Sequence, residues 1–304
     1  MFQAPIICYC YGLKRADIAA KLAQPDLRLD DLIAETRITT KCTACAVDLN
    51  AMIDQMHASE RLNHLRAEEL KASTKGWQQK VDRLDSGFFI CDGEIKTALR
   101  FANHPPFTND ESLCAPHDFT VTLFDNGGRV CARHWGHVAV REEQTIELAG
   151  LQGCPEQGWF LLHMRPRGPG RYGTLRPQAA LKGRGWISCY HTQFHTDAAR
   201  AGRRSGVALW LVEGRTRAQV SIINGSPVSS RYQASLETDV GMRHTEGTIA
   251  GNGACFLDVD SAFGGLPETG AVVLRLDSEQ PTRKNIINRH PDGTLGVDHF
   301  PNRV

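Results

Sequence analysis

Four cysteines near the start of the chain have a spacing that suits metal binding. Cys8 and Cys10 form a Cys-x-Cys pair, and after 31 further residues Cys42 and Cys45 form a Cys-x-x-Cys pair. Each pair brings two soft thiolates within bonding reach of one metal without long-range folding, so the set suits one [2Fe–2S] cluster or one zinc ion. The sequence therefore predicts a metal centre on these two pairs.

The residues between the pairs have the periodicity of short helices that could bring the cysteines together. Residues 14–24 and 30–37 carry apolar side chains at helical spacing, and Pro25 separates the two segments. A third helix is expected to begin around Ala44, which places Cys45 near its N-terminus. Backbone N–H groups and the positive end of the helix dipole favour a thiolate at that position.

Residues 6–53, IICYCYGLKRADIAAKLAQPDLRLDDLIAETRITTKCTACAVDLNAMI, resemble the small [2Fe–2S] domain of bacterioferritin-associated ferredoxin. That domain also occurs inside larger oxidoreductases and in some metallochaperones. The resemblance implies a helix-turn-helix unit with the cluster near its surface, held by all four cysteines. One departure is Thr43, where the family usually has glycine after its third cysteine. A bulkier residue there is expected to alter the N–H to sulfur bonds that tune the potential.

Two other uses of the four cysteines stay open. A structural zinc site could use the same ligands. Disulfides fit less well, because ten cysteines are scattered through 304 residues and the start MFQAPIICYCYG has none of the features of a secretory leader. We therefore expect a reducing, cytoplasmic setting. The remaining cysteines stand singly and are interpreted as small buried residues rather than ligands: Cys91, Cys114, Cys131, Cys154, Cys189 and Cys255.

Composition narrows the class of partner. The chain is 41% hydrophobic with a formal net charge of +1, and it contains no run of 18 apolar residues. A membrane span is not expected, and the balanced charge gives no general reason to expect nucleic acid as a partner. The length suggests two or three compact units.

Beyond the cysteines, residues 58–85 have an apolar spacing near 3.6 and are predicted to form a helical linker. The chain that follows is rich in Gly, Pro, Thr and short apolar runs typical of strands. Runs of this kind occur at 121–130, 145–151, 158–164 and 186–194, and again at 234–244, 255–266, 270–276 and 294–300.

The two sets of runs repeat at a nearly constant interval. The offsets are 113 from Leu123 to Leu236, 111 from Ile146 to Leu257, 112 from Gly158 to Gly270 and 108 from His191 to His299. Offsets this regular indicate a duplication, and each copy has the short strands and turns of a β-sandwich. No named family is recognised in this region.

The predicted fold class is α+β multidomain: a small helical [2Fe–2S] domain, a helical linker, and a duplicated all-β sandwich-like region. The expected boundaries are 1–57 for the cluster domain, 58–85 for the linker, 86–200 for the first sandwich-like repeat and 201–304 for the second.

Histidines and acidic residues in the β region carry weaker hypotheses. His191 and His299 fall at corresponding places in the two copies, where they could line a shared cleft or serve packing. The His-x-x-His and His-x-x-x-His pairs need a bend in the chain before either could share a metal. Those pairs are His134 with His137 and His191 with His195, and the acidic pairs read as solvent-facing are Glu142 with Glu143 and Asp258 with Asp260. Flavin and nicotinamide fingerprints are missing from the sequence.

Taken together, the sequence predicts a [2Fe–2S] protein for one-electron transfer or for redox or iron sensing, whose β region docks a protein partner. It is expected to be an electron-transfer or binding protein rather than a catalyst on its own. One alternative is an oxidoreductase whose β region holds a separate substrate or metal site. Another is a binding module in which the metal is purely structural. The partner, the reduction potential and the oligomeric state are left open.

Overall fold

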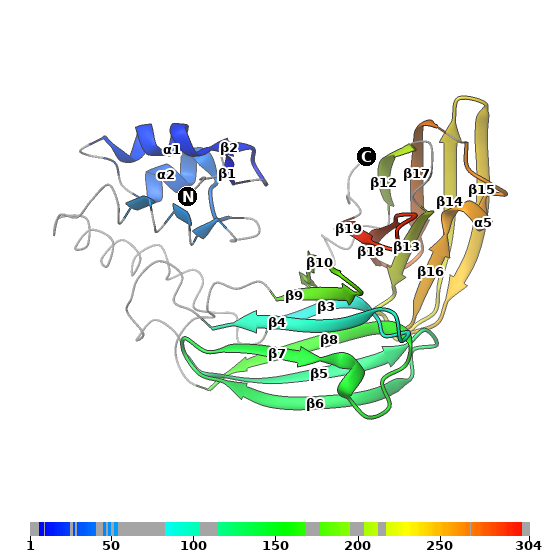
Figure 1. Ribbon diagram of the computed structural model, residues 1–304, viewed down its shortest axis with the longest axis horizontal. Helices are drawn as coiled ribbons and strands as arrows, with labels where there is room; N and C mark the ends of the chain where they lie inside the picture. The colour runs from blue at the N-terminus through cyan, green and yellow to red at the C-terminus, as the bar shows by residue number, and fades with distance from the viewer. Residues whose placement is uncertain are drawn as a thin grey trace.

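A computed structural model gives the structure of the chain (Figure 1). It describes residues 6–53, 83–103, 115–167, 177–194, 204–211 and 217–299, apart from single residues and short gaps at 9, 25, 26, 28, 41–44, 47, 50, 51 and 268. Two parts are described: a small N-terminal unit and a much larger β region. Most of the predicted helical linker therefore lies outside the described residues.

The N-terminal unit combines a short hairpin with helices. Strand β1 (Ile6–Cys8) pairs with β2 (Leu13–Lys14), and helices α1 (Arg15–Leu22) and α2 (Leu29–Thr36) follow. Ile18 and Leu22 of α1 and Leu32 of α2 are buried, because their spacing places them on one helix face. The unit therefore has an apolar core of its own.

The β region consists of antiparallel strands. Its first half contains β3 (Arg83–Ile90), β4 (Lys96–Ala102), β5 (His117–Asp125), β6 (Val130–Val138), β7 (Glu143–Glu147), β8 (Gln157–Pro166), β9 (Gln178–Gly183), β10 (Trp186–His191) and β11 (Gln193–Phe194). Its second half contains β12 (Arg204–Leu211), β13 (Arg217–Ile223), β14 (Ser230–Thr238), β15 (Gly241–Ile249), β16 (Ala254–Asp258), helix α5 (Val259–Ala262), β17 (Gly270–Ser278), β18 (Arg283–Arg289) and β19 (Leu295–His299).

The two halves have the same strand order. In the first half the sheets run β3-β8-β5-β6, with β11 added beside β3, and β7-β4-β9-β10. In the second half they run β12-β17-β14-β15 and β16-β13-β18-β19. The four sequence offsets of about 110 residues each join strands at the same place in this order: β5 with β14, β7 with β16, β8 with β17 and β10 with β19.

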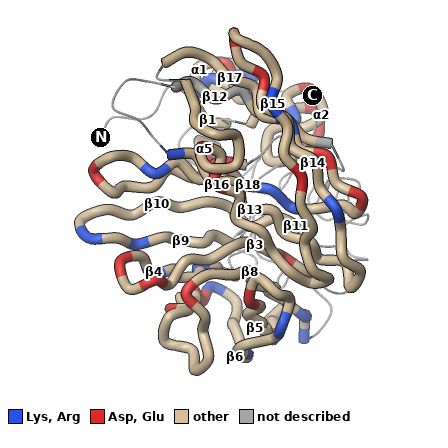
Figure 2. Tube along the Cα trace, turned by 90° about the vertical axis from the view of Figure 1, so that its right-hand side faces the viewer, with Lys and Arg blue, Asp and Glu red and all other residues tan. Residues whose placement is uncertain are grey.

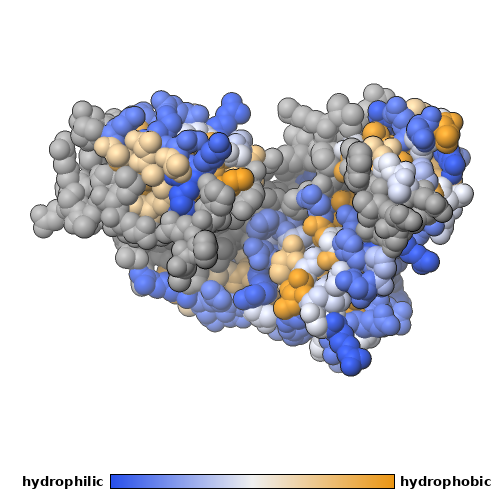
Figure 3. Space-filling model, turned by 45° about the horizontal axis from the view of Figure 1, so that its top comes forward, coloured by the Kyte–Doolittle hydropathy of each residue, from blue (hydrophilic) through white to orange (hydrophobic). Residues whose placement is uncertain are grey.

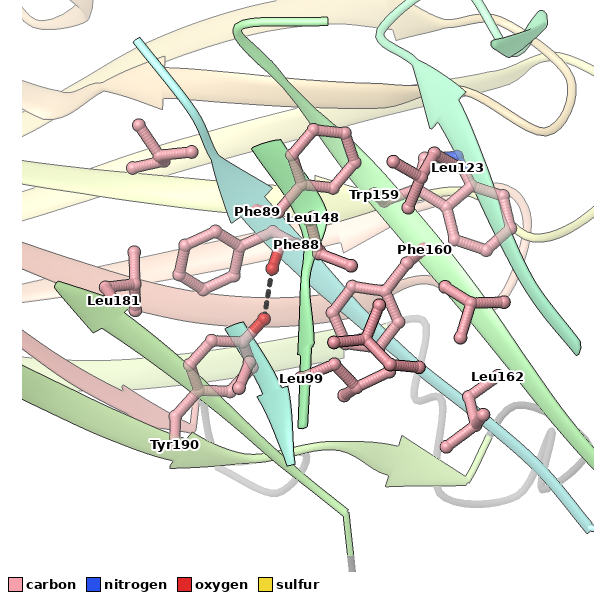
Figure 4. Close-up of a cluster of buried hydrophobic side chains, with 14 of the residues drawn as sticks. Phe88, Phe89, Leu99, Leu123, Leu148, Trp159, Phe160, Leu162, Leu181 and Tyr190 are labelled. Atoms are coloured by element: carbon pink, nitrogen blue, oxygen red, sulfur yellow. Dashed lines mark hydrogen bonds between the residues drawn. The ribbon is translucent and has the colours of Figure 1, made fainter. Parts of the chain in front are cut away.

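Alternation of apolar and polar residues explains how the sheets stack. In β5, Phe119, Val121 and Leu123 are buried while the residues between them are partly exposed. β14 and β17 show the same period of two. Each half therefore buries one face of each sheet against the other, which is the arrangement of a β-sandwich. Figure 4 shows the aromatic core of the first half.

The two sandwiches share part of one core. Phe88 stacks on Tyr190 with ring centroids 4.7 Å apart and meets Phe256 of the second half edge-on at 6.0 Å. The Trp159 indole Nε1 donates to the backbone oxygen of Asn252 at 2.7 Å. Apolar residues of the second half that belong to the core cluster of the first are Ile223, Ala254, Ile287 and Leu295. The halves therefore pack as one body.

The structure overturns the predicted α+β class. Strand accounts for 56% of the described residues and helix for 13%, so the chain is mostly β. The classification of the whole chain as an iron–sulfur electron-transfer protein is also wrong. Most of the residues that the structure describes belong to a β-rich body. Residues 83–85, assigned to the helical linker, belong to strand β3.

Two strand predictions are also corrected. Residues 186–194 do not form one strand: β10 and β11 belong to different sheets, and the chain crosses between them at Thr192. Residues 255–266 leave the strand at Asp258, whose carboxylate accepts from Ser261 N–H at 2.8 Å and caps α5. A carboxylate at that position favours helix initiation over strand continuation.

The described surface is mixed in character. Basic and acidic residues are interspersed along the chain rather than gathered by sign (Figure 2). On the face seen in Figure 3, hydrophilic residues dominate and hydrophobic ones form small groups. Among the described helices, none has the length and apolar character needed to cross a bilayer.

Tyr190 provides a test of the first core. Its hydroxyl donates to the backbone oxygen of Phe88 inside the sandwich (Figure 4), and burial raises its pKa well above the ordinary value. Tyr190→Phe leaves that buried carbonyl short of a partner, so we expect the free energy of unfolding to fall by about 1–2 kcal/mol in urea titrations. Tyr232→Phe is the matched control, because the Tyr232 hydroxyl meets only the Cys255 thiol at 3.7 Å among the contacts described for it. An equal loss of unfolding free energy in both variants would contradict a stabilising role for the Tyr190 hydrogen bond.

A buried lysine lies close to the joint between the halves. Lys284 of β18 is 1% exposed, and its Nζ donates to the Ser205 hydroxyl at 2.9 Å. Burial lowers its pKa to about 8, with nearby Arg283 adding to the effect and Asp277 opposing it. The Gln193 amide of the first half donates to the Lys284 backbone oxygen at 3.2 Å.

The lowered pKa of Lys284 predicts that the stability of the fold depends on pH. The pKa of a lysine is about 10.4 in the unfolded chain. Between pH 8 and 10.4 the unfolded state therefore binds more protons, and stability rises with pH by up to about 3 kcal/mol in total. Lys284→Met should remove this rise in urea titrations run from pH 7 to 10.5. Lys182→Met, which removes a half-exposed lysine from the equivalent strand β9, should leave it in place. A rise of equal size in the Lys284 variant would contradict the prediction.

Candidate metal centre

The first two candidate ligands lie on a tight hairpin. Cys8 ends β1 and pairs with Leu13 of β2, and Cys10 lies in the turn between the strands. Gly12 closes the turn at φ +64°, a left-handed conformation that glycine adopts without steric cost. The hairpin thus holds the Cys-x-Cys pair in a short, sharply turned segment.

The fourth candidate ligand lies where the third helix begins. Leu49 N–H donates to the Cys45 backbone oxygen at 2.9 Å, the spacing of an α-helical hydrogen bond. Residues 46, 48, 49, 52 and 53 are helical. Cys45 thus directly precedes the helix, next to the free backbone N–H groups of its first turn.

Three of the four cysteines contact the same apolar core. Cys8 is 2% exposed and Cys45 5% exposed, both within the cluster formed by α1, α2 and the third helix, and the half-buried Cys10 packs against it. Thiolates in an apolar shell suit a soft metal centre.

Side-chain contacts tie the hairpin to the segments that lead to the second cysteine pair. The Tyr11 and Thr40 hydroxyls lie 3.1 Å apart. The Arg15 guanidinium bonds the Asp48 carboxylate at 3.0 Å, which joins α1 to the third helix. Through these contacts, the residues on either side of the Cys-x-x-Cys pair are held near the Cys-x-Cys turn.

Cys42 lies outside the described residues, together with Thr43. Within the part of the chain that the structure describes, no three His, Cys, Asp or Glu side chains gather into a metal-binding group. The structure therefore describes the surroundings of three ligand candidates and not the geometry of the complete set.

The histidine pair predicted from the repeat lies on neighbouring strands. His191 ends β10 opposite Gln178, and His299 ends β19 opposite Asn285. β10 and β19 lie side by side (Figure 1). The side chain of His299 is not among those described. The structure therefore shows that the two strands are neighbours, and it does not show where the two imidazoles lie.

The other histidine and carboxylate candidates have local partners. His137 lies 3.6 Å from the Asp118 carboxylate, which the Arg167 guanidinium also bonds, at 2.7 Å. The Glu142 carboxylate accepts from Ala139 N–H at 2.6 Å. His195 falls outside the described residues. These groups stabilise turns and strand edges.

Sequence reasoning missed two features. It interpreted the later cysteines as small buried residues, whereas Cys189 is exposed and the other described ones, Cys91, Cys131, Cys154 and Cys255, are half-buried. It also gave no signal for the Ser205–Lys284 contact. That contact joins residues 79 positions apart, and only tertiary structure reveals it.

Comparisons with known proteins add no assignment. No family model matches the chain. Among solved structures, a chain described as a beta-galactosidase from Bacteroides fragilis is 15% identical at a TM-score of 0.18, over 71% of this chain and 31% of that one. A beta-glucuronidase from glycoside hydrolase family 2 is 10% identical at a TM-score of 0.18, over 73% and 24%. The chain thus spans about a third or less of these proteins, and scores this low carry no functional argument.

Proposed function

We propose that the N-terminal unit binds a [2Fe–2S] cluster through Cys8, Cys10, Cys42 and Cys45, and that the β region docks a protein partner. The chain would then be a binding protein whose N-terminal unit responds to iron or redox status. The observation that carries the proposal is the placement of Cys8, Cys10 and Cys45 against one small apolar core, on a tight turn and at a helix start. The sequence resemblance of residues 6–53 supports the same cofactor.

The residues around the cysteines fit a cluster in two ways. The ligand candidates are thiols, the donors that [2Fe–2S] clusters use, and an apolar shell limits the access of water to them. When bound, a [2Fe–2S] cluster supplies a centre that gains or loses one electron.

The thiols of this chain would have to lose their protons as they become ligands. Cluster binding would therefore depend on pH and contribute to folding of the unit. With few elements around one small core, the fold of this unit would be sensitive to whether the site is filled. That sensitivity is what a sensor of iron or redox status requires.

Exposed apolar side chains support a docking role for the β region. Trp135 is 72% exposed on β6, Ile187 66% on β10 and Met242 52% on β15. All three strands lie at the edges of their sheets. Edge strands offer unpaired backbone groups, and exposed aromatic or apolar side chains beside them are typical of protein-binding surfaces.

The proposal includes a reducing, cytoplasmic setting, in which thiolate ligands and a cluster persist. The partner is proposed to be a protein. Along the described trace, Lys and Arg are interspersed with Asp and Glu (Figure 2), which favours a protein partner over nucleic acid.

Metal analysis tests the cofactor. Protein purified without oxygen should contain two irons and two acid-labile sulfides per chain and give a rhombic S = 1/2 EPR signal on reduction. Cys42→Ser should lose both the metal and the signal. Cys189→Ser, which removes an exposed cysteine remote in sequence from the four ligands, should keep them. One zinc and no sulfide per chain would refute the cluster.

A further inference from the structure

Strand β6 has an edge that a further strand could join. It is the last strand of its sheet, and β5 is the strand it pairs with in the part of the chain that the structure describes. It is also the lowest strand in Figure 1, at the outside of the first sandwich. An edge strand directs backbone N–H and C=O groups away from its sheet, where a strand from another molecule can bind them.

Other described segments cover the two ends of β6. At its start, the turn before β8 lies against the backbone of Cys131, because a Cβ at Gly153 would lie 2.5 Å from the Cys131 oxygen. At its end, the Gln144 side-chain amide donates to the His137 backbone oxygen at 3.3 Å. The open part of the edge is therefore residues 132–136.

The Gln144 contact also indicates which backbone groups face outward. Gln144 belongs to β7 of the other sheet, so the His137 oxygen that it bonds points away from β5. Backbone direction repeats every two residues along a strand, which gives Trp135 and Arg133 the same outward N–H and C=O groups. Their side chains lie on the outer face of the sheet, since the alternate position Ala132 is buried in the core.

These two residues give the open edge a definite chemical character. Trp135 is 72% exposed, so its indole presents a large apolar surface to solvent. Arg133 is exposed, lies opposite Thr122, and forms no ion pair with a residue that the structure describes. A guanidinium in this condition is ready to bond a carboxylate. The edge thus presents one aromatic and one cationic side chain, two residues apart.

The other two edge strands with exposed apolar side chains are less suitable. β10 lies beside β19, which occupies the space next to it (Figure 1). Next to β15, the Arg243 guanidinium donates to the backbone oxygens of Phe263 and Gly265 at 2.8 and 2.7 Å. β15 also carries Glu246 close to Arg243, so it offers no single charge by which to select a partner.

We propose that β6 binds an extended segment of the protein partner as an added antiparallel strand, with an acidic residue opposite Arg133 and an aromatic or β-branched residue opposite Trp135. This site rests on the docking role proposed for the β region. Residues opposite each other in paired strands have side chains on the same face, with Cβ atoms roughly 4.5–5.5 Å apart. The carboxylate would therefore meet the guanidinium, and the apolar side chain would meet the indole.

The register of β6 determines the order of these residues in the partner. Arg133 and Trp135 are two positions apart, so their partners are also two positions apart. Because the added strand runs antiparallel to β6, the apolar residue comes first, any residue follows, and the acidic residue comes third. The surface thus selects an apolar-x-acidic segment in an extended conformation.

Selection of random peptides displayed on phage, with the full chain as bait, tests the proposal. Enriched peptides should contain the apolar-x-acidic pattern, and fluorescence polarisation gives the Kd of the most enriched one. Arg133→Glu should weaken its binding at least about tenfold, and a peptide whose acidic residue is changed to lysine should bind this variant better than the original peptide does. Trp135→Ala should weaken binding at least about tenfold.

Peptide N-methylation distinguishes an added strand from contact by side chains alone. The residue opposite Trp135 would exchange two backbone hydrogen bonds with it, so a methyl group on its nitrogen should abolish binding. A methyl group on the nitrogen of the next residue, which faces away from β6, should be tolerated. Equal effects of the two methyl groups would overturn strand addition.

Matched variants control for effects outside the site. Arg217→Glu changes an exposed arginine of β13, and Val228→Ala shortens a side chain that is 59% exposed. Both should bind the peptide as the unchanged protein does. Because Arg133 and Trp135 are exposed, replacing them should alter the melting temperature little.

The outcomes separate this site from the wider proposal. Peptides that bind the Arg133 and Trp135 variants as tightly as the unchanged protein would overturn the β6 site and leave docking elsewhere on the β region. If no peptide is enriched, both the site and the docking of extended segments are refuted. Absence of iron and sulfide would refute the cluster, whereas peptide binding at β6 would stand.

Discussion

The shared apolar core between the two sandwiches is the contact on which most of the described structure depends. Phe88 stacks on Tyr190 within its own half and lies edge-on to Phe256 of the other. Residues from β13, β16, β18 and β19 complete the cluster of the first half. Burial of this kind is worth roughly 25 cal/mol for each Å² of apolar surface removed from water, so separating the halves would expose costly surface on both. The β region consequently behaves as one body made from two similar parts.

Local sequence patterns located many of the helices and strands but did not predict the fold class of the whole chain. Period-two alternation marked β5, β14 and β17, and the Asp-Asn-Gly-Gly turn marked the β5–β6 hairpin. Helical spacing placed α1 and α2 within about two residues of their bounds. The predicted class was α+β because it counted a helical domain and a helical linker beside the strands, and it missed β3, β4 and β9 of the first copy and β12, β13 and β18 of the second.

The missed strands are those whose residues break the alternation. β3 has six consecutive buried residues, a pattern that does not distinguish a strand from a buried helix. β18 begins with Arg283 and Lys284, which composition places on a surface; the fold buries both, and Lys284 donates to the Ser205 hydroxyl. For the candidate metal centre, residue type and spacing named four cysteines, and the structure describes three of them around one core. The Ser205–Lys284 contact could not be predicted, because nothing local links two residues so far apart in the chain.

The joint between the sandwiches combines the shared apolar core with direct backbone contacts. A Cβ at Gly128 would lie 2.2 Å from the Gly251 backbone oxygen, and one at Gly253 would lie 2.7 Å from the Asn126 oxygen. Ala254 N–H donates directly to the Asn126 oxygen at 3.1 Å. Main-chain atoms in direct contact have no rotamers to exchange, so these contacts resist sliding more than an interface of long side chains does. The two sandwiches therefore keep one relative orientation. A protein bound at the edge of one sandwich would keep a constant distance and orientation to a molecule bound at the edge of the other.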